Sequence, residues 1–130
     1  MIVAGGRNFK GSFADFKLVR KAVRKYGIKI IVSGKASGAD TFGEFCADIL
    51  GLKVKHFPAA WDDLTVDPCI VKIRWDGSKY NVLAGHNRNK KMAEYTDYVF
   101  LFPGGGGTAN MRKEAKLVGK KIVFDKGEFL

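Results

Sequence analysis

The chain has 130 residues, a length typical of one domain built around one hydrophobic core. It carries 23 Lys and Arg against 13 Asp and Glu, a formal net charge of +10 at pH 7. This excess favours an anionic partner, either a nucleic acid or a small anion. No apolar run approaches the ~20 residues that cross a bilayer, and no leader-like segment is evident. We therefore expect a soluble, cytoplasmic protein with no membrane partner.

Its two cysteines, Cys46 and Cys69, lie in different kinds of segment and have no metal-ligand spacing. We therefore expect reduced, structural thiols rather than a disulfide framework or a zinc site. We expect no metal and no cofactor.

The first part of the sequence alternates predicted strands with predicted helices. Ser12 and Asp15 form a capping box at the start of the first helix, and Gly27 and Gly51 end the two helices. In chain order the expected elements are a strand at Met1 to Ala4, a helix at about Phe13 to Tyr26, a strand at Ile28 to Val32, a helix at about Ala39 to Leu50 and a strand at Leu52 to Phe57.

After Pro58 the alternation is interrupted. Two alternating runs flank the turn sequence Asp76-Gly77-Ser78, which is typical of a β-hairpin. We expect this hairpin to be an insertion, at about residues 66–85, outside the main sheet. The remaining elements are a helix at Asn87 to Tyr95, a strand at Tyr98 to Phe102, a helix at Ala109 to Val118 and a strand at Lys121 to Phe124.

This order predicts an α/β fold over residues 1–130, a single Rossmann-like, three-layer domain with a mainly parallel five-stranded sheet. In such sheets ligands bind at the carboxyl ends of the strands, near the point where the strand order reverses. Three glycine-bearing loops should meet there: Gly5 to Phe9, Ser33 to Asp40 and Pro103 to Thr108.

Four consecutive glycines separate an apolar strand from a predicted helix. Backbone N–H groups without side chains and the positive end of a helix dipole both attract an oxyanion. We expect a phosphate to bind there, and a flexible surface loop is the alternative. The expected phosphate-binding residues are Pro103, Gly104, Gly105, Gly106, Gly107 and Thr108.

The second glycine loop allows close approach of the backbone but lacks the ending of a Walker loop and the spacing of a dinucleotide fingerprint. Asp40, at the start of the next helix, would accept a ribose hydroxyl or a water, or would only complement the helix dipole. The candidate ligand-binding residues of this loop are Ser33, Gly34, Ala36, Ser37, Gly38 and Asp40.

Two arginines are candidate charge partners. Arg7 follows Gly5-Gly6 at the end of the first strand, where a planar guanidinium suits bidentate phosphate binding. Phe9 would stack on a base or pack in the core. Arg88 and Asn89 lie in the first turn of the predicted third helix, where the dipole disfavours a cation. Arg88 should therefore pair with a bound anion or a carboxylate.

Four motifs together resemble the SLOG superfamily and, more closely, its YspA/YpsA-related (YAcAr) branch of bacteria and phages. They are Ala4 to Phe9, Ser33 to Asp40, Ala84 to Ala93, and Gly107-Thr108 with Asn110-Met111. The resemblance implies a Rossmann-like fold, a nucleotide or nucleotide-derived ligand and a homo-oligomer. The superfamily includes the Lonely Guy phosphoribohydrolases, which cleave the N-glycosidic bond of nucleoside monophosphates, and the DNA-processing protein A family, which binds single-stranded DNA.

The Lonely Guy pattern PGGxGTxxE places a catalytic glutamate third after the threonine, where this chain has Met111. Glu114 lies one helical turn further, ~4.5 Å along the axis at ~1.5 Å per residue. Hydrolysis needs a carboxylate within ~3 Å of the reacting atoms. If the chain is an enzyme, the expected catalytic residues are Glu114, Asp40 and Arg88, with Glu44 as a further candidate acid.

These observations rank three functions. The first is binding of a nucleotide or nucleotide-derived signal, to sense, carry or sequester it, for example as a phage-encoded sponge. The alternative is a phosphoribohydrolase-type N-glycosidase. The third is a single-stranded nucleic-acid-binding module, in which Trp75 and Tyr80 of the hairpin would stack on bases. The basic residues are dispersed along the chain, which favours a pocket over a nucleic-acid groove.

Overall fold

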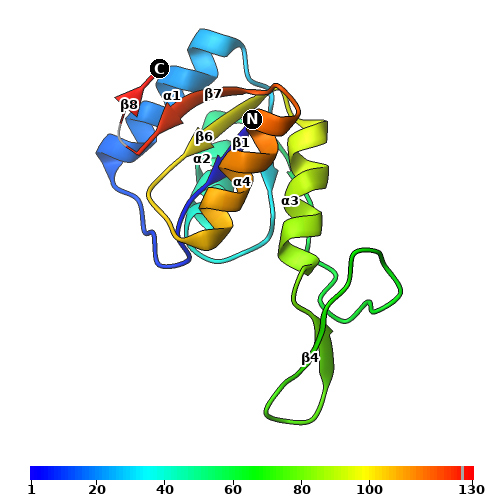
Figure 1. Ribbon diagram of the computed structural model, residues 1–130. Coiled ribbons are helices and arrows are strands. Elements are labelled where there is room, and N and C mark those ends of the chain that lie inside the picture. Colours follow the sequence, from blue (N-terminus) through cyan, green and yellow to red (C-terminus); the bar gives the residue numbers. More distant parts are fainter. Residues whose placement is uncertain (127) are drawn as a thin grey trace.

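The computed structural model describes residues 1–126 and 128–130 and confirms the predicted α/β, Rossmann-like fold (Figure 1). The main sheet has the strand order β3-β2-β1-β6-β7-β8, and β4 and β5 form a separate two-stranded sheet. In chain order the elements are β1 (Ile2–Ala4), α1 (Phe13–Tyr26), β2 (Ile30–Ser33), α2 (Ala39–Leu50), β3 (Lys53–His56), β4 (Val71–Ile73), β5 (Lys79–Asn81), α3 (Ala84–Tyr95), β6 (Tyr98–Leu101), α4 (Gly106–Leu117), β7 (Lys121–Asp125) and β8 (Glu128–Phe129).

The expected five strands are parallel to their neighbours, and β1 lies at the centre. Ile2 of β1 is in register with Val32 of β2 on one side and with Val99 of β6 on the other. The strand order therefore reverses at β1, and the loops after β1 and β6 diverge at that point. A sixth strand, β8, was not expected. It pairs antiparallel with β7 and forms the edge of the sheet.

Two apolar clusters cover the two faces of the sheet, because successive strand residues point to opposite faces. Phe16 of α1 and Phe42 of α2 pack on one face. Met92 of α3 and Met111 of α4 pack on the other. The domain therefore has three layers, with α1 and α2 opposite α3 and α4. No helix in the described part of the chain is long and apolar enough to cross a bilayer.

Two helices begin three residues earlier than the sequence indicated. α3 starts at Ala84 rather than Asn87, and α4 starts at Gly106 rather than Ala109. Glycine disfavours helix intrinsically, so the α4 start depends on packing of the later residues of the helix, of which Met111 and Ala115 are buried. As a result Arg88 lies in the second turn of α3, and the glycines themselves form the first turn of α4.

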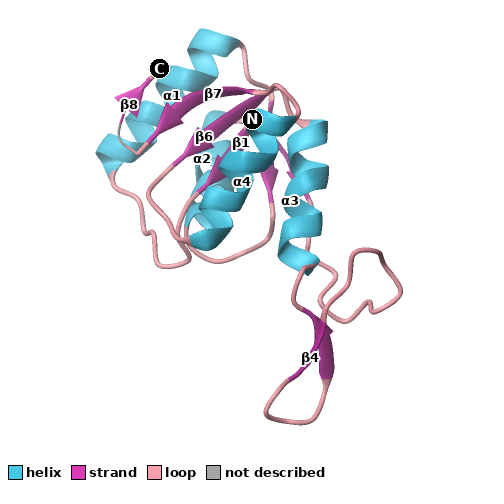
Figure 2. Cartoon of the chain, in the orientation of Figure 1, coloured by secondary structure: helices cyan, strands magenta, loops and turns pink. Residues whose placement is uncertain are grey.

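The predicted hairpin lies outside the main sheet and projects from the body of the domain (Figure 2). We call residues 58–83, between β3 and α3, the arm. Asn81 holds its base: the backbone N–H of Asn81 donates to Trp61 O (2.8 Å), and its side-chain Oδ1 accepts from the N–H groups of Ile70 (3.1 Å) and Leu83 (3.0 Å). At the far end of the arm, Trp75 is fully exposed.

Candidate functional site

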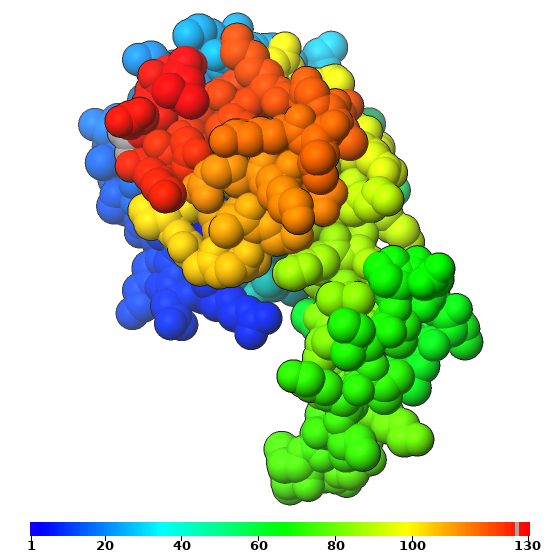
Figure 3. All heavy atoms as spheres, viewed as in Figure 1, coloured from blue at the N-terminus to red at the C-terminus, as the bar shows by residue number. Residues whose placement is uncertain are grey.

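A cavity of about 1180 Å³ lies at the carboxyl ends of β1, β2 and β6. All three predicted glycine loops contribute to its lining, and α3 and the arm supply further parts of the wall. In the space-filling view the surface is hollowed between the body of the domain and the arm (Figure 3). The structure thus brings together segments from both ends of the chain at the expected edge of the sheet.

Two glycines hold the loops close to one another. Gly38 has a φ of +76°, and a Cβ added there would lie 2.1 Å from Gly6 O. A Cβ on Gly104 would lie 2.6 Å from Gly6 N. Hydrogen bonds from Ala39 N to Gly6 O (3.2 Å) and from Gly6 N to Pro103 O (2.9 Å) join the same backbones. Gly38 and Gly104 therefore act as spacers that permit the cavity, and neither lines it.

The next three glycines, Gly105, Gly106 and Gly107, have a different environment. A Cβ on any of them would meet no atom within 4 Å, and all three line the cavity. Gly105 is the N-cap of α4 and makes no side-chain cap hydrogen bond. The first-turn N–H groups of a helix have no partner within the helix, so this helix end offers donors to an anion in the cavity.

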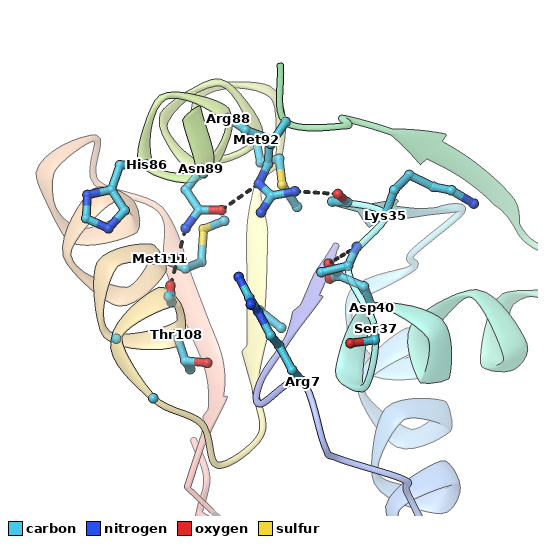
Figure 4. A pocket seen from close by; sticks show the side chains of 18 of the residues that line it. Arg7, Lys35, Ser37, Asp40, His86, Arg88, Asn89, Met92, Thr108 and Met111 are labelled. Carbon is cyan, nitrogen blue, oxygen red and sulfur yellow. Dashed lines mark hydrogen bonds between the residues drawn. The ribbon is translucent and has the colours of Figure 1, made fainter. Parts of the chain in front are cut away.

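Arg88 is fixed by three acceptors from different parts of the chain. Its Nε donates to Asn89 Oδ1 (2.9 Å), and its Nη1 donates to Gly34 O (Figure 4). Nη1 also donates to Phe57 O (3.3 Å). Burial lowers the pKa of the Arg88 guanidinium, the Asp40 carboxylate opposes this shift, and the charge of Arg7 adds to it. The guanidinium remains charged at neutral pH, because an arginine is not deprotonated there in proteins.

Arg7 points into the middle of the cavity, toward the side where Arg88 lies (Figure 4). Its side chain makes no ion pair within residues 1–126 and 128–130. Two guanidinium groups thus face the same space with one carboxylate, Asp40, beside them. Such an arrangement favours a further anion between the arginines.

Among residues 1–126 and 128–130, Asp40 is the only Asp or Glu that lines the cavity. Its Oδ2 accepts from Ala36 N (3.1 Å), which holds the loop after β2 against the start of α2. Burial raises the pKa of the Asp40 carboxyl above 3.8, while the Ala36 N–H, the Arg88 charge and the Gly34 N–H oppose the shift. A carboxyl in this environment can accept a hydroxyl proton or exchange a proton with a ligand.

Asn89 connects α3 to the first turn of α4. This buried side chain donates from Nδ2 to Gly107 O (3.2 Å) and to Asn110 Oδ1 (3.0 Å), while its Oδ1 accepts from Arg88. The position of Arg88 and the glycine turn of α4 are therefore coupled through one amide.

Several predicted site residues lie elsewhere. The Phe9 ring stacks on Phe102, with 4.3 Å between ring centroids, and packs edge-on against Phe42. Glu114 does not line the cavity. Glu44 accepts from Ser33 Oγ (2.9 Å) and from Lys35 Nζ (3.2 Å). The predicted site residues that do line the cavity are Gly5, Gly6, Arg7, Gly34, Ala36, Ser37, Asp40, Arg88, Asn89, Gly105, Gly106, Gly107 and Thr108.

Sequence reasoning missed most of the cavity wall that the arm contributes. Trp61, Arg74 and Tyr80 line this side, and of these the sequence indicates only Tyr80, as part of a nucleic-acid surface. The available signal was a cluster of aromatic and cationic residues in an insertion that follows a strand of a parallel sheet. Met111 lines the cavity and is also part of an apolar cluster.

Both cysteines are free, and burial raises the pKa of the Cys46 thiol to about 12. Within the described residues, no three His, Cys, Asp or Glu side chains gather as a metal site would require.

Models of known protein families, curated proteins and solved structures give no match to this chain.

Proposed function

We propose that the cavity binds a nucleotide or a nucleotide-derived molecule, with a phosphate at the first turn of α4 between Arg7 and Arg88. The observation that carries this proposal is the open, uncapped glycine turn opposite two guanidinium groups. Backbone N–H groups, a helix dipole and planar guanidinium groups are the chemistry that recognises phosphate.

The charge of the lining supports an anionic ligand. Two of the cationic side chains in the lining are paired with carboxylates outside it, Lys35 with Glu44 (3.2 Å) and Arg74 with Asp62 (3.1 Å). The other two, Arg7 and Arg88, face one carboxylate, Asp40, which leaves a net charge of +1. A phosphate monoester carries about −1.5 to −2 at pH 7. It would therefore neutralise this charge and relieve the repulsion between Arg7 and Arg88.

The lining also supports binding without turnover. In the resemblance to the Lonely Guy pattern, Met111 stands where that pattern has its catalytic glutamate. Met111 lines the cavity, and Glu114 does not. Such a protein would sense, carry or sequester its ligand. Membership of the SLOG superfamily, in its YspA/YpsA-related branch, is part of the proposal and rests on the four motifs.

A phosphoribohydrolase is the second candidate, because Asp40 is a carboxyl with a raised pKa inside the cavity. Release of free base from a panel of nucleoside monophosphates tests it. Loss of that activity in Asp40→Asn, with ligand binding retained, would place hydrolysis ahead of binding.

Titration calorimetry with nucleoside monophosphates and the matched nucleosides tests the proposed function. We expect nucleotides to bind and nucleosides to bind at least about 10-fold more weakly, a difference of about 1.4 kcal/mol. Arg7→Ala should reduce nucleotide affinity by a similar factor, because it removes a guanidinium that points into the cavity. Arg7 is exposed, so the substitution should leave the packing of the domain intact.

The matched control is Arg24→Ala, which removes an exposed arginine in the last turn of α1. This variant should bind as the wild type does. Equal affinity for nucleosides and nucleotides, or an equal loss in both arginine variants, would contradict a phosphate site at Arg7.

A further inference from the structure

The arm presents flat side chains to the cavity. Trp61, Arg74 and Tyr80 all line it, and they belong to a different segment from the glycine loops and Arg7. We call these three residues the aromatic wall. The cavity therefore joins two chemically different linings, one of backbone N–H groups and guanidinium charge and one of planar rings.

Trp61 is held in place on α3. A Cβ added at Gly85 would come within 3.2 Å of Trp61 Cη2, so the indole lies directly against the first turn of that helix. The Trp61 carbonyl accepts from Asn81 N (2.8 Å) at the base of the arm. Trp61 is half-buried, so part of the side chain remains accessible.

Arg74 and Tyr80 form a stacked pair. The Arg74 guanidinium carbon lies 4.7 Å from the centroid of the Tyr80 ring. Nη1 of Arg74 pairs with Asp62 Oδ1 (3.1 Å) and donates to Ser78 Oγ (3.2 Å) and Lys79 O (3.3 Å). These contacts fix the guanidinium over the ring and neutralise it locally, so it presents a plane rather than a phosphate ligand.

We propose that the aromatic wall is a subsite for the heteroaromatic base of the ligand, an inference that rests on the proposed function. Aromatic rings and arginine planes are the surfaces on which nucleic-acid bases stack in proteins. The cavity exceeds the ~300–1,000 Å³ of pockets for drug-sized ligands, so it has room for a phosphate at α4 and a base on the arm.

The positions of the aromatic side chains distinguish this base subsite from an open surface that binds nucleic acid. The fully exposed Trp75 does not line the cavity, whereas Trp61 and Tyr80 are half-buried and do. A base on the wall is thus part of a molecule held within the cavity. The arm accordingly determines which bases are accepted, and the glycine turn binds the phosphate that all nucleotides share.

The test compares AMP, GMP, CMP and UMP with inorganic phosphate as probes, by titration calorimetry on the full chain. Trp61→Leu and Tyr80→Ala should each weaken the best-bound mononucleotide about 10-fold and leave the affinity for inorganic phosphate unchanged. Arg7→Ala should weaken both probes. Trp75→Phe is the matched control and should weaken neither.

A second readout remains interpretable if Trp61→Leu fails to fold. The chain has two tryptophans, so Trp75→Phe leaves Trp61 as the only one. The best-bound mononucleotide should quench its fluorescence, and inorganic phosphate should not.

Loss of mononucleotide affinity in Arg7→Ala alone, with no quenching of Trp61, would overturn the base subsite and leave the phosphate site intact. Absence of binding of every probe to the wild type would overturn the proposed function and the subsite with it.

Discussion

The first turns of α1 and α4 differ in how their backbone N–H groups, which have no partner within the helix, are satisfied. At α1, Ser12 Oγ accepts from Asp15 N (3.2 Å) and Asp15 Oδ2 accepts from Ser12 N (2.9 Å), so side chains satisfy the end of the helix. At α4 the N-cap is Gly105, which has no side chain to do so. The capped end contributes stability within the chain, and the uncapped end leaves its donors and its dipole for the phosphate that we propose.

The largest expected effect is on the free energy of unfolding, when alanine replaces a tightly packed glycine, Gly38, rather than an open one, Gly107. Gly38→Ala should lower the free energy of unfolding by ~3 kcal/mol or more, because it combines a positive φ with a contact of 2.1 Å to a backbone oxygen. Gly107→Ala, in the open first turn of α4, should change it by no more than ~1 kcal/mol and in the stabilising direction. Urea unfolding measures both, and equal losses would show that the open glycines are also structural spacers.

Adding a cap at α4 should make it resemble α1. Gly105→Asp should raise the free energy of unfolding by a few tenths of a kcal/mol, about the difference between a capping residue and glycine. It should weaken phosphate-containing probes at least ~10-fold, because the carboxylate occupies the donors and repels the anion.

Two variants separate capping from charge. Gly105→Asn provides the cap without the charge and should weaken binding less. Ser12→Ala should cost ~1 kcal/mol of stability and leave affinity unchanged. If Gly105→Asp binds phosphate as the wild type does, the start of α4 is not the phosphate site.

The smallest expected effect is on the pH dependence of the free energy of unfolding, to which the Asp40 and Asp125 carboxyls should contribute with opposite signs. The pKa of Asp40 is raised above 3.8 mainly by burial, so the folded state holds this proton more tightly than the unfolded state. The contribution of Asp40 to the free energy of unfolding should therefore fall as the pH rises from 3.8 through the folded-state pKa. Asp40→Asn should remove this fall.

Asp125 should show the opposite sign. The Arg112 guanidinium donates to its two oxygens from Nε (2.8 Å) and Nη2 (2.7 Å) and lowers the pKa of the carboxyl below 3.8. Its contribution is present above 3.8 and is lost as the pH falls through the folded-state pKa. Denaturation between about pH 3 and pH 6 for Asp40→Asn and Asp125→Asn measures both slopes, and identical profiles would contradict the assignment.

Local patterns were sufficient for the order of elements and for the parallel sheet. The apolar runs, the Ser12–Asp15 box and the turn at Asp76 to Ser78 each act over a few residues, and the structure confirms them. The starts of α3 and α4 were placed too late, because glycine suggests a loop unless packing from the rest of the helix compensates.

The predicted meeting of three loops followed from a general property of parallel sheets. The hydrogen bonds of Arg88 could not be predicted in this way, because its acceptors Gly34 O and Phe57 O come from loops that are distant in the sequence. The aromatic wall could not be predicted from the sequence either. Its position depends on how Trp61 packs against Gly85, and no periodicity in the sequence encodes that contact.

The central position of β1 has a consequence for synthesis. β1 (Ile2–Ala4) is flanked by β2 and by β6 (Tyr98–Leu101), so half of its pairing waits until β6 has left the ribosome. Pairing between the two ends of a chain closes a long loop and is slow for that reason. The cavity needs the loops after both strands, so it cannot form in a nascent chain until α4 has packed on the sheet.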